Sequence, residues 1–162
     1  MKKKQRSKKN KVKFLCKIAI ACDHRGVGLK EKLKKVLEKK QYEVVDCGTQ
    51  SGDSVDYPDF IFPAAELVAA GECCRGIGIC YTGIGSSIVA NKVRGIRASL
   101  CKTVEEAKLT RAHNDSNMLI LGSGFLTPGA AEAILTTWLE TPFDGGRHQA
   151  RIQKIMDYEK RE

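Results

Sequence analysis

The segment 80–86, with the sequence Cys-Tyr-Thr-Gly-Ile-Gly-Ser, holds the residues best suited to chemistry. It follows a short apolar run, 76–80, and precedes a run typical of a helix. Glycines at such a turn allow backbone N–H groups at a helix N-terminus to point at an anion. A cysteine there has its thiolate stabilised and can act as a base or nucleophile. We interpret Cys80 as catalytic; packing at the end of a buried strand is the alternative.

The two glycines do not match either of the common phosphate-binding motifs. A dinucleotide fingerprint would continue Gly83-x-Gly85 with Gly or Ala at position 88, where this chain has Ile88. A P-loop is excluded because G-x-x-x-x-G-K-[ST] occurs nowhere in the chain. Taken alone, the glycines indicate only a tight turn.

Two histidines are further candidates. His24 follows Asp23 at the end of an apolar run, and His113 is followed by Asn114. Each alone could be an ordinary surface group. Together we expect them at the functional edge of one sheet, with Cys80.

A cationic helix face is predicted near the C-terminus. Arg147, Arg151 and Lys154 are spaced i, i+4, i+7 within 147–160. The preceding glycine pair places Arg147 at the helix start, where the helix dipole disfavours a cation. An anionic ligand would offset this conflict, although a solvated helix face is the simpler interpretation.

Alternating strand and helix patterns would position these residues. Apolar runs predict strands at 16–22, 42–47, 76–80, 96–101 and 117–121. Helical spacing or capping signals predict helices at 29–37, 58–70, 88–93, from 103, at 128–139 and at 147–160. This order predicts one three-layer α/β/α domain with a five-stranded parallel, Rossmann-like sheet. Ligands of such sheets bind beyond the carboxyl ends of the strands.

Composition restricts the class of protein. The chain has 162 residues, 42% of them hydrophobic, and no apolar run of the ~18–20 residues that a membrane span requires. Eight of the nine net positive charges lie on residues 1–13, so the remainder is nearly neutral. We expect 1–13 to be a flexible basic tail that binds polyanions weakly at most, and 14–162 to be the domain.

The seven cysteines do not indicate a metal site. No C-x-x-C motif occurs, and no Cys/His set has zinc spacing. We therefore expect reduced thiols in a cytoplasmic protein, and no metal or cofactor.

Seven motifs in one order resemble the type B ribose-5-phosphate isomerase family, which includes galactose-6-phosphate isomerase subunits. They are Ala21-Cys-Asp-His-Arg-Gly26, Asp46-Cys-Gly-Thr49, Asp56-Tyr-Pro-Asp59, Cys80-x-Thr-Gly-Ile-Gly85 with Ala90-Asn-Lys92, Gly95-Ile-Arg-Ala98, Arg111-x-His-Asn-Asp115 and Gly145-Gly-Arg-His-Gln149. The resemblance covers 16–160 and leaves the basic tail outside.

The resemblance implies a metal-free aldose–ketose isomerase of the pentose phosphate pathway, acting on ribose 5-phosphate through a cis-enediolate. It implies a homodimer with active sites shared between subunits, and leaves open whether dimers pair into tetramers. Cys80, with Thr82 beside it, is the implied base, and His113 the ring-opening acid/base. The implied anion hole is formed by the backbone of Gly83, Ile84, Gly85 and Ser86. The implied sugar ligands are Asp23, also in the catalytic group, Tyr57 and Asn114, and the implied phosphate ligands are His24, Arg147 and Arg151.

Two residues depart from the family pattern. Tyr81 stands where cysteine-type members usually have glycine, and Gly124 stands where many members have an arginine that helps bind phosphate. Two alternatives stay open: an isomerase of a six-carbon sugar phosphate such as allose or galactose 6-phosphate, and a non-catalytic nucleotide- or polyanion-binding module.

Overall fold

The central sheet has five parallel strands in the order β2-β1-β3-β5-β4. Its strands are β1 (Lys17–Cys22), β2 (Glu43–Asp46), β3 (Arg75–Cys80), β4 (Ala98–Leu100) and β5 (Met118–Gly122). The helices are α1 (Val27–Lys39), α2 (Pro58–Ala69), α3 (Ile84–Ala90), α4 (Val104–Asn114), α5 (Pro128–Glu140) and α6 (Arg147–Glu159). These elements come from a computed structural model that describes residues 15–161; the predicted tail 1–13 lies outside the described residues.

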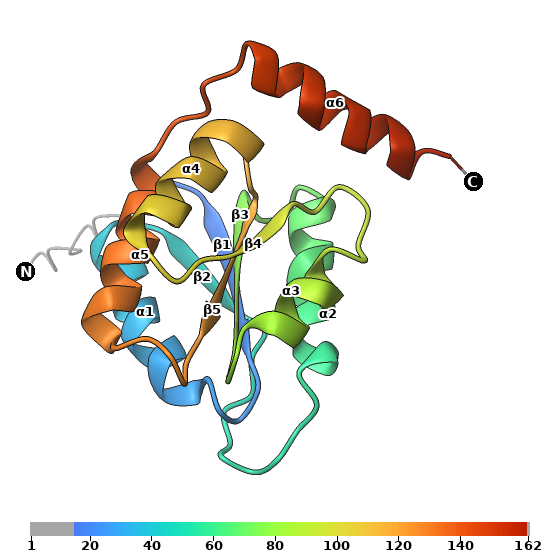
Figure 1. Ribbon diagram of the computed structural model, residues 1–162. Helices are drawn as coiled ribbons and strands as arrows, with labels where there is room; N and C mark the ends of the chain where they lie inside the picture. The colour runs from blue at the N-terminus through green and yellow to red at the C-terminus, as the bar shows by residue number, and fades with distance from the viewer. Residues whose placement is uncertain (1–14, 162) are drawn as a thin grey trace, which may run out of the picture.

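The helices cover both faces of the sheet, as Figure 1 shows: α1, α4 and α5 lie on one face, α2 and α3 on the other. Alternate strand residues supply the two cores. Ile18 and Ile20 face the α1/α5 side, whereas Ala19 and Ala21 face α2. The three-layer, single-domain prediction is therefore confirmed. No helix within 15–161 is long and apolar enough to cross a membrane.

The main error in the predicted elements concerns α3, which begins at Ile84 and ends at Ala90 instead of spanning 88–93. Gly83 has a φ of 78°, in the left-handed region, and this sharp turn starts the helix one residue later. Ile88 is apolar but exposed, so its hydrophobicity does not mark the buried helix face. The helix therefore starts much nearer to Cys80 than the apolar pattern predicts.

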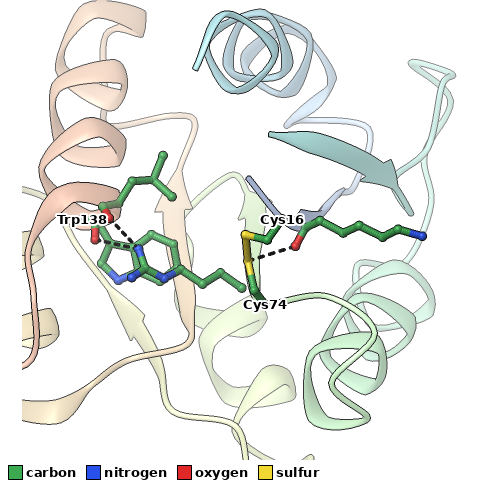
Figure 2. The surroundings of a disulfide bond; sticks show 6 residues. Cys16, Cys74 and Trp138 are labelled. Atoms are coloured by element: carbon green, nitrogen blue, oxygen red, sulfur yellow. Dashed lines mark hydrogen bonds between the residues drawn. A yellow bond between two sulfur atoms is a disulfide. The ribbon is translucent and has the colours of Figure 1, made fainter. Parts of the chain in front are cut away.

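A disulfide joins Cys16 to Cys74, with their Cα atoms 6.3 Å apart. Each cysteine directly precedes one of the neighbouring strands β1 and β3 (Figure 2). The Cys74 N–H donates to the carbonyl of Lys17 over 2.9 Å. The prediction of reduced thiols is therefore wrong for this pair. The two cysteines are 58 positions apart in the sequence, and they become neighbours only because β1 and β3 are adjacent in the sheet.

Candidate active site

Cys80 is the last residue of β3, with its side chain 4% exposed. The N–H of Gly83 donates to its sulfur over 3.2 Å, across the turn that leads into α3. An N–H directed at sulfur stabilises negative charge on it, because a thiolate accepts hydrogen bonds more strongly than a thiol. The turn that starts α3 therefore also positions a hydrogen-bond donor, the Gly83 N–H, against the Cys80 sulfur.

The other free cysteines have different surroundings. Burial raises the pKa of Cys22 to about 12, and burial likewise raises the pKa of Cys101 to about 12. The thiols of Cys22, Cys47 and Cys101 donate to backbone carbonyls, which favours the neutral form. Among the free cysteines of residues 15–161, the sulfur that accepts a backbone N–H is that of Cys80. This separates it from cysteines that only fill the core.

Of the four backbone N–H groups in the predicted anion hole, at residues 83–86, two donate hydrogen bonds within the described chain and two do not. Gly83 donates to the cysteine sulfur, and the Ile84 N–H donates to the hydroxyl of Thr82 over 3.1 Å. The N–H groups of Gly85 and Ser86 lie in the first turn of α3, where helix amides have no acceptor within the helix. They are the amides that an oxyanion beside Cys80 could use.

Tyr57 lies against this first turn, at the start of α2. A Cβ atom on Gly85 would stand only 2.7 Å from the Tyr57 hydroxyl oxygen, so a side chain there would displace the ring. Ser86 is fully buried, and its hydroxyl has no hydrogen-bond partner in the described chain. Together these residues bring polar groups from three elements to the carboxyl edge of the sheet.

Asp23 and His24 follow β1 at the same edge. One carboxylate oxygen of Asp23 accepts the N–H groups of Arg25 and Gly26, over 2.9 and 3.2 Å, and holds the turn into α1. The Nδ1 atom of His24 accepts the N–H of Val55 over 3.2 Å, so neutral His24 carries its proton on Nε2. This contact, which the sequence does not reveal, fastens the loop after β2 across the site.

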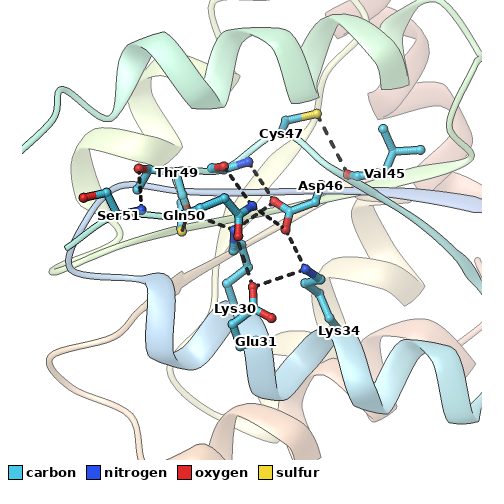
Figure 3. Close-up of polar contacts among 11 residues, drawn as sticks. Lys30, Glu31, Lys34, Val45, Asp46, Cys47, Thr49, Gln50 and Ser51 are labelled. Atoms are coloured by element: carbon cyan, nitrogen blue, oxygen red, sulfur yellow. Dashed lines mark hydrogen bonds and ion pairs between the residues drawn. The ribbon is translucent and has the colours of Figure 1, made fainter. Parts of the chain in front are cut away.

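The loop after β2 rests on a buried lysine. Lys30 is fully buried, and its ammonium donates to Asp46 and to the carbonyl of Thr49, each over 2.9 Å (Figure 3). Lys34 donates to the second carboxylate oxygen of Asp46 over 2.7 Å. Partial burial opposes the ionisation of Asp46, but hydrogen bonds from the two lysines, Gln50 and the Gly48 N–H outweigh this and lower its pKa to about 2.

We expect Asp46→Asn to lower the free energy of unfolding by about 3 kcal/mol at neutral pH, because the buried Lys30 charge loses its hydrogen-bonded carboxylate and keeps only the more distant Glu31, 3.6 Å away. Since the pKa of folded Asp46 lies below the unfolded value, its contribution is complete above about pH 4 and is lost towards pH 2. Urea unfolding across this range measures both effects. Glu140→Gln, which breaks the exposed pair with Lys40, should cost less than about 1 kcal/mol. Equal costs for the two variants would contradict a structural role for the buried pair.

The remaining predicted site residues lie together elsewhere. His113 and Asn114 end α4, and Arg147 and Arg151 lie on α6. The rings of His113 and His148 are stacked, with centroids 4.2 Å apart and planes 6° apart. Burial lowers the pKa of His148, and the neighbouring positive charges of His113 and the two arginines lower it further.

The expectation that His113 shares an edge with Cys80 is wrong within one chain. Helix α4 runs back across the sheet, so its C-terminus meets the amino ends of the strands. There the Arg97 side chain, just before β4, donates to the carbonyl of Asn114 over 3.0 Å. Figure 1 shows α6 beyond this amino edge, opposite the junctions β1–α1 and β3–α3. One chain therefore carries two separate clusters of candidate site residues, one around Cys80 and one around His113, and we call these clusters the two half-sites.

His113, Asp144 and His148 could be considered as metal ligands, since one donor atom of each lies within 4.8 Å of the others. A metal bound by imidazole lies close to the ring plane, along the nitrogen lone pair. Because the two rings are nearly parallel and stacked, no position lies in both planes. The arrangement fits a stacked histidine pair better than a metal centre.

The Cys80 half-site lies where α1 and α3 leave neighbouring strands towards opposite faces, which is the ligand-binding position of doubly wound sheets. Fold and half-site together define an α/β enzyme with a buried cysteine beside helix amides that have no acceptor within α3. A family model described as Ribose/Galactose Isomerase matches residues 18–155. The chain belongs to the ribose/galactose isomerase family.

Relatives of the type B branch are similar over almost their whole length. Ribose-5-phosphate isomerase B of Escherichia coli is 44% identical over 145 residues, covering 90% of this chain and 97% of that protein. A Bacillus subtilis protein, 52% identical over 90% of this chain and 98% of its own length, has a name no more specific than sugar phosphate isomerase. These relatives confirm the family resemblance read from the motifs.

Solved structures agree. Ribose-5-phosphate isomerase B of Clostridium thermocellum superposes with a TM-score of 0.87 at 50% identity, covering 89% of this chain and 97% of that one. The enzyme of Mycoplasma genitalium with bound ribulose-5-phosphate superposes with a TM-score of 0.89 at 41% identity, covering 93% and 100%.

Proposed function

We propose that this protein interconverts ribose 5-phosphate and ribulose 5-phosphate through a cis-enediolate, with Cys80 as the base. The observation that carries the proposal is the Gly83 N–H donated to the Cys80 sulfur, beside the unpaired amides of Gly85 and Ser86. Abstracting a proton from the carbon next to a carbonyl requires both a positioned base and a stabilised oxyanion.

The proton transfer follows from this geometry. The Cys80 thiolate removes the proton from C2 of the open-chain aldose, and the electron pair moves to form the C1–C2 double bond and negative charge on O1. The amides of Gly85 and Ser86 stabilise that charge. The O2 proton then passes to O1, and the Cys80 thiol returns its proton to C1 as the C1–C2 double bond becomes the C2 carbonyl of the ketose. Asp23 and Tyr57, at the same edge, are placed to hold the sugar hydroxyls.

Ring opening needs a second acid/base, which we assign to His113 of another copy of the chain. The half-sites lie at opposite edges of one sheet, so one chain cannot bring His113 to Cys80. A homodimer in which the His113 half-site of each chain faces the Cys80 half-site of its partner would complete both. Arg147 and Arg151 would then meet the phosphate.

The surface around Cys80 supports such a partner. Ile84 and Ile88 of α3 are 55% and 57% exposed, and Phe125, in the loop after β5, is 66% exposed. Apolar side chains exposed together around a functional site are typical of interaction surfaces. A second copy seated there would cover them and bring its own α4 and α6 to the site.

The five-carbon substrate is favoured over a six-carbon one by Tyr81. Its ring fills the space above Gly124. Because Tyr81 directly follows Cys80, we infer that its bulk leaves less room for a longer sugar chain. We expect kcat/KM for ribose 5-phosphate to exceed that for allose and galactose 6-phosphates by about 10-fold or more, since one additional carbon in a fitted pocket changes selectivity by this order.

The test is a direct assay of the three sugar phosphates, with EDTA present throughout. Equal or faster turnover of a six-carbon substrate would overturn the assignment of substrate. Turnover of none of them would overturn the proposed activity and favour a non-catalytic binding module.

A further inference from the structure

Arg25 occupies a fixed position beside the catalytic cysteine that the proposed mechanism does not use. Its backbone N–H donates to Asp23, and its carbonyl lies 2.9 Å from the Ser123 hydroxyl. The same hydroxyl lies 3.3 Å from the carbonyl of Cys80. The turn that carries Arg25 is thus connected through Ser123 to the end of β3.

The side chain of Arg25 rests on an aromatic platform. Its guanidinium carbon lies 5.2 Å from the ring centroid of Tyr81, and that ring contacts Phe125 with centroids 5.9 Å apart. A Cβ atom on Gly124 would stand 2.4 Å from the Tyr81 ring, so a glycine there is what allows the ring to lie in this place. Tyr81 and Gly124, the two residues that depart from the family pattern, therefore pack against each other.

Arg25 also lacks a counter-ion. Within residues 15–161, no carboxylate forms an ion pair with its exposed guanidinium. Contact with the face of a ring leaves the N–H edge of a guanidinium available for a planar, two-point contact with an oxyanion. Of the arginines that the structure describes, Arg25 is the one in a loop at the carboxyl edge.

A second donor lies next to it. His24 is oriented by the Val55 N–H on Nδ1, which leaves the Nε2 proton free to donate. One strong cation and one oriented neutral donor on adjacent residues suit a phosphate monoester. We propose that Arg25, held on the Tyr81 ring, binds the phosphate of the sugar phosphate from the Cys80 side of the site; this rests on the proposed isomerase function.

The test substitutes Arg25 and Tyr81, the ring that supports it, in separate variants. Arg25→Gln should raise KM for ribose 5-phosphate by roughly 10- to 100-fold, the usual effect of losing hydrogen bonds to a charged group, with kcat changed by less than about threefold. Arg25→Lys should recover part of the loss. Tyr81→Phe keeps the ring and should raise KM less than Tyr81→Leu, which should raise it by about two- to fivefold.

The matched control is Lys102→Gln, which removes a positive charge from the loop after β4 at the same edge and should leave KM unchanged within about twofold. Calorimetric titration with inorganic phosphate supplies a readout independent of turnover: Arg25→Gln should weaken phosphate binding in parallel with KM. Unchanged KM and unchanged phosphate affinity would overturn the proposal. If no sugar phosphate is isomerised, the proposed function fails, and the phosphate titration alone decides whether Arg25 binds the anion.

Discussion

Cys80→Ala should lower kcat for ribose 5-phosphate by at least about 10³, with the fold unchanged. The substitution removes the base, and general-base catalysis contributes typically 10²–10⁴. It also leaves the Gly83 N–H without its sulfur acceptor. Steady-state kinetics on protein of verified thermal stability measures the effect.

The control for this prediction is another buried thiol. Cys73 is 2% exposed and lies before β3, at the amino edge, where burial raises the pKa of its thiol. Cys73→Ala should reduce stability slightly and leave kcat within about twofold, because it removes packing and no chemistry. A Cys80→Ala variant as active as this control would contradict the assignment of the base.

His113→Gln should lower kcat by about 10² when ribose 5-phosphate is the substrate, because glutamine can donate a hydrogen bond but cannot transfer a proton to the ring oxygen. Ribulose 5-phosphate has no free 5-hydroxyl and is therefore acyclic, so enediolate formation from it needs no ring opening. Solvent deuterium should still enter C1 of ribulose 5-phosphate in this variant.

This pair of measurements separates the two roles. Cys80→Ala should strongly lower both net isomerisation of ribose 5-phosphate and deuterium exchange, whereas His113→Gln should strongly lower only the first. Loss of exchange in His113→Gln would instead place His113 in the proton transfer between carbons.

The Cys80 half-site could be predicted because its residues are adjacent in sequence. A cysteine ending an apolar run, followed by two glycines, predicts the end of a strand and a tight turn, although α3 begins at Ile84, four residues earlier than predicted. The helix predicted from residue 103 is confirmed for the same reason, because Thr103 and Glu106 form a capping box at the start of α4. Local patterns of this kind depend on backbone geometry that the residues themselves impose.

Features that depend on the direction of elements were not predictable in the same way. His113 has polar neighbours, as functional residues often do. The edge of the sheet at which it lies, however, depends on where α4 ends. The Cys16–Cys74 bond depends on β1 and β3 being neighbours. In the sequence, Lys30 cannot be distinguished from the other charged residues of an amphipathic helix. Only the folded structure shows that it is buried against Asp46.

Because the two half-sites lie at opposite edges of the sheet, we propose that one active site needs Cys80 from one chain and His113 from another. Mixed dimers of Cys80→Ala and His113→Gln test it directly. In a mixed dimer, one site combines intact Cys80 with intact His113, and the other carries both defects. With random pairing, half of the dimers are mixed.

The measurement is kcat of the two variants co-expressed with different affinity tags, beside each variant alone. We expect recovery to about a quarter of the unmodified activity, or to about half in mixed dimers purified through both tags. Purified mixed dimers no more active than the better parent variant would contradict it, because each chain would then hold a complete site of its own.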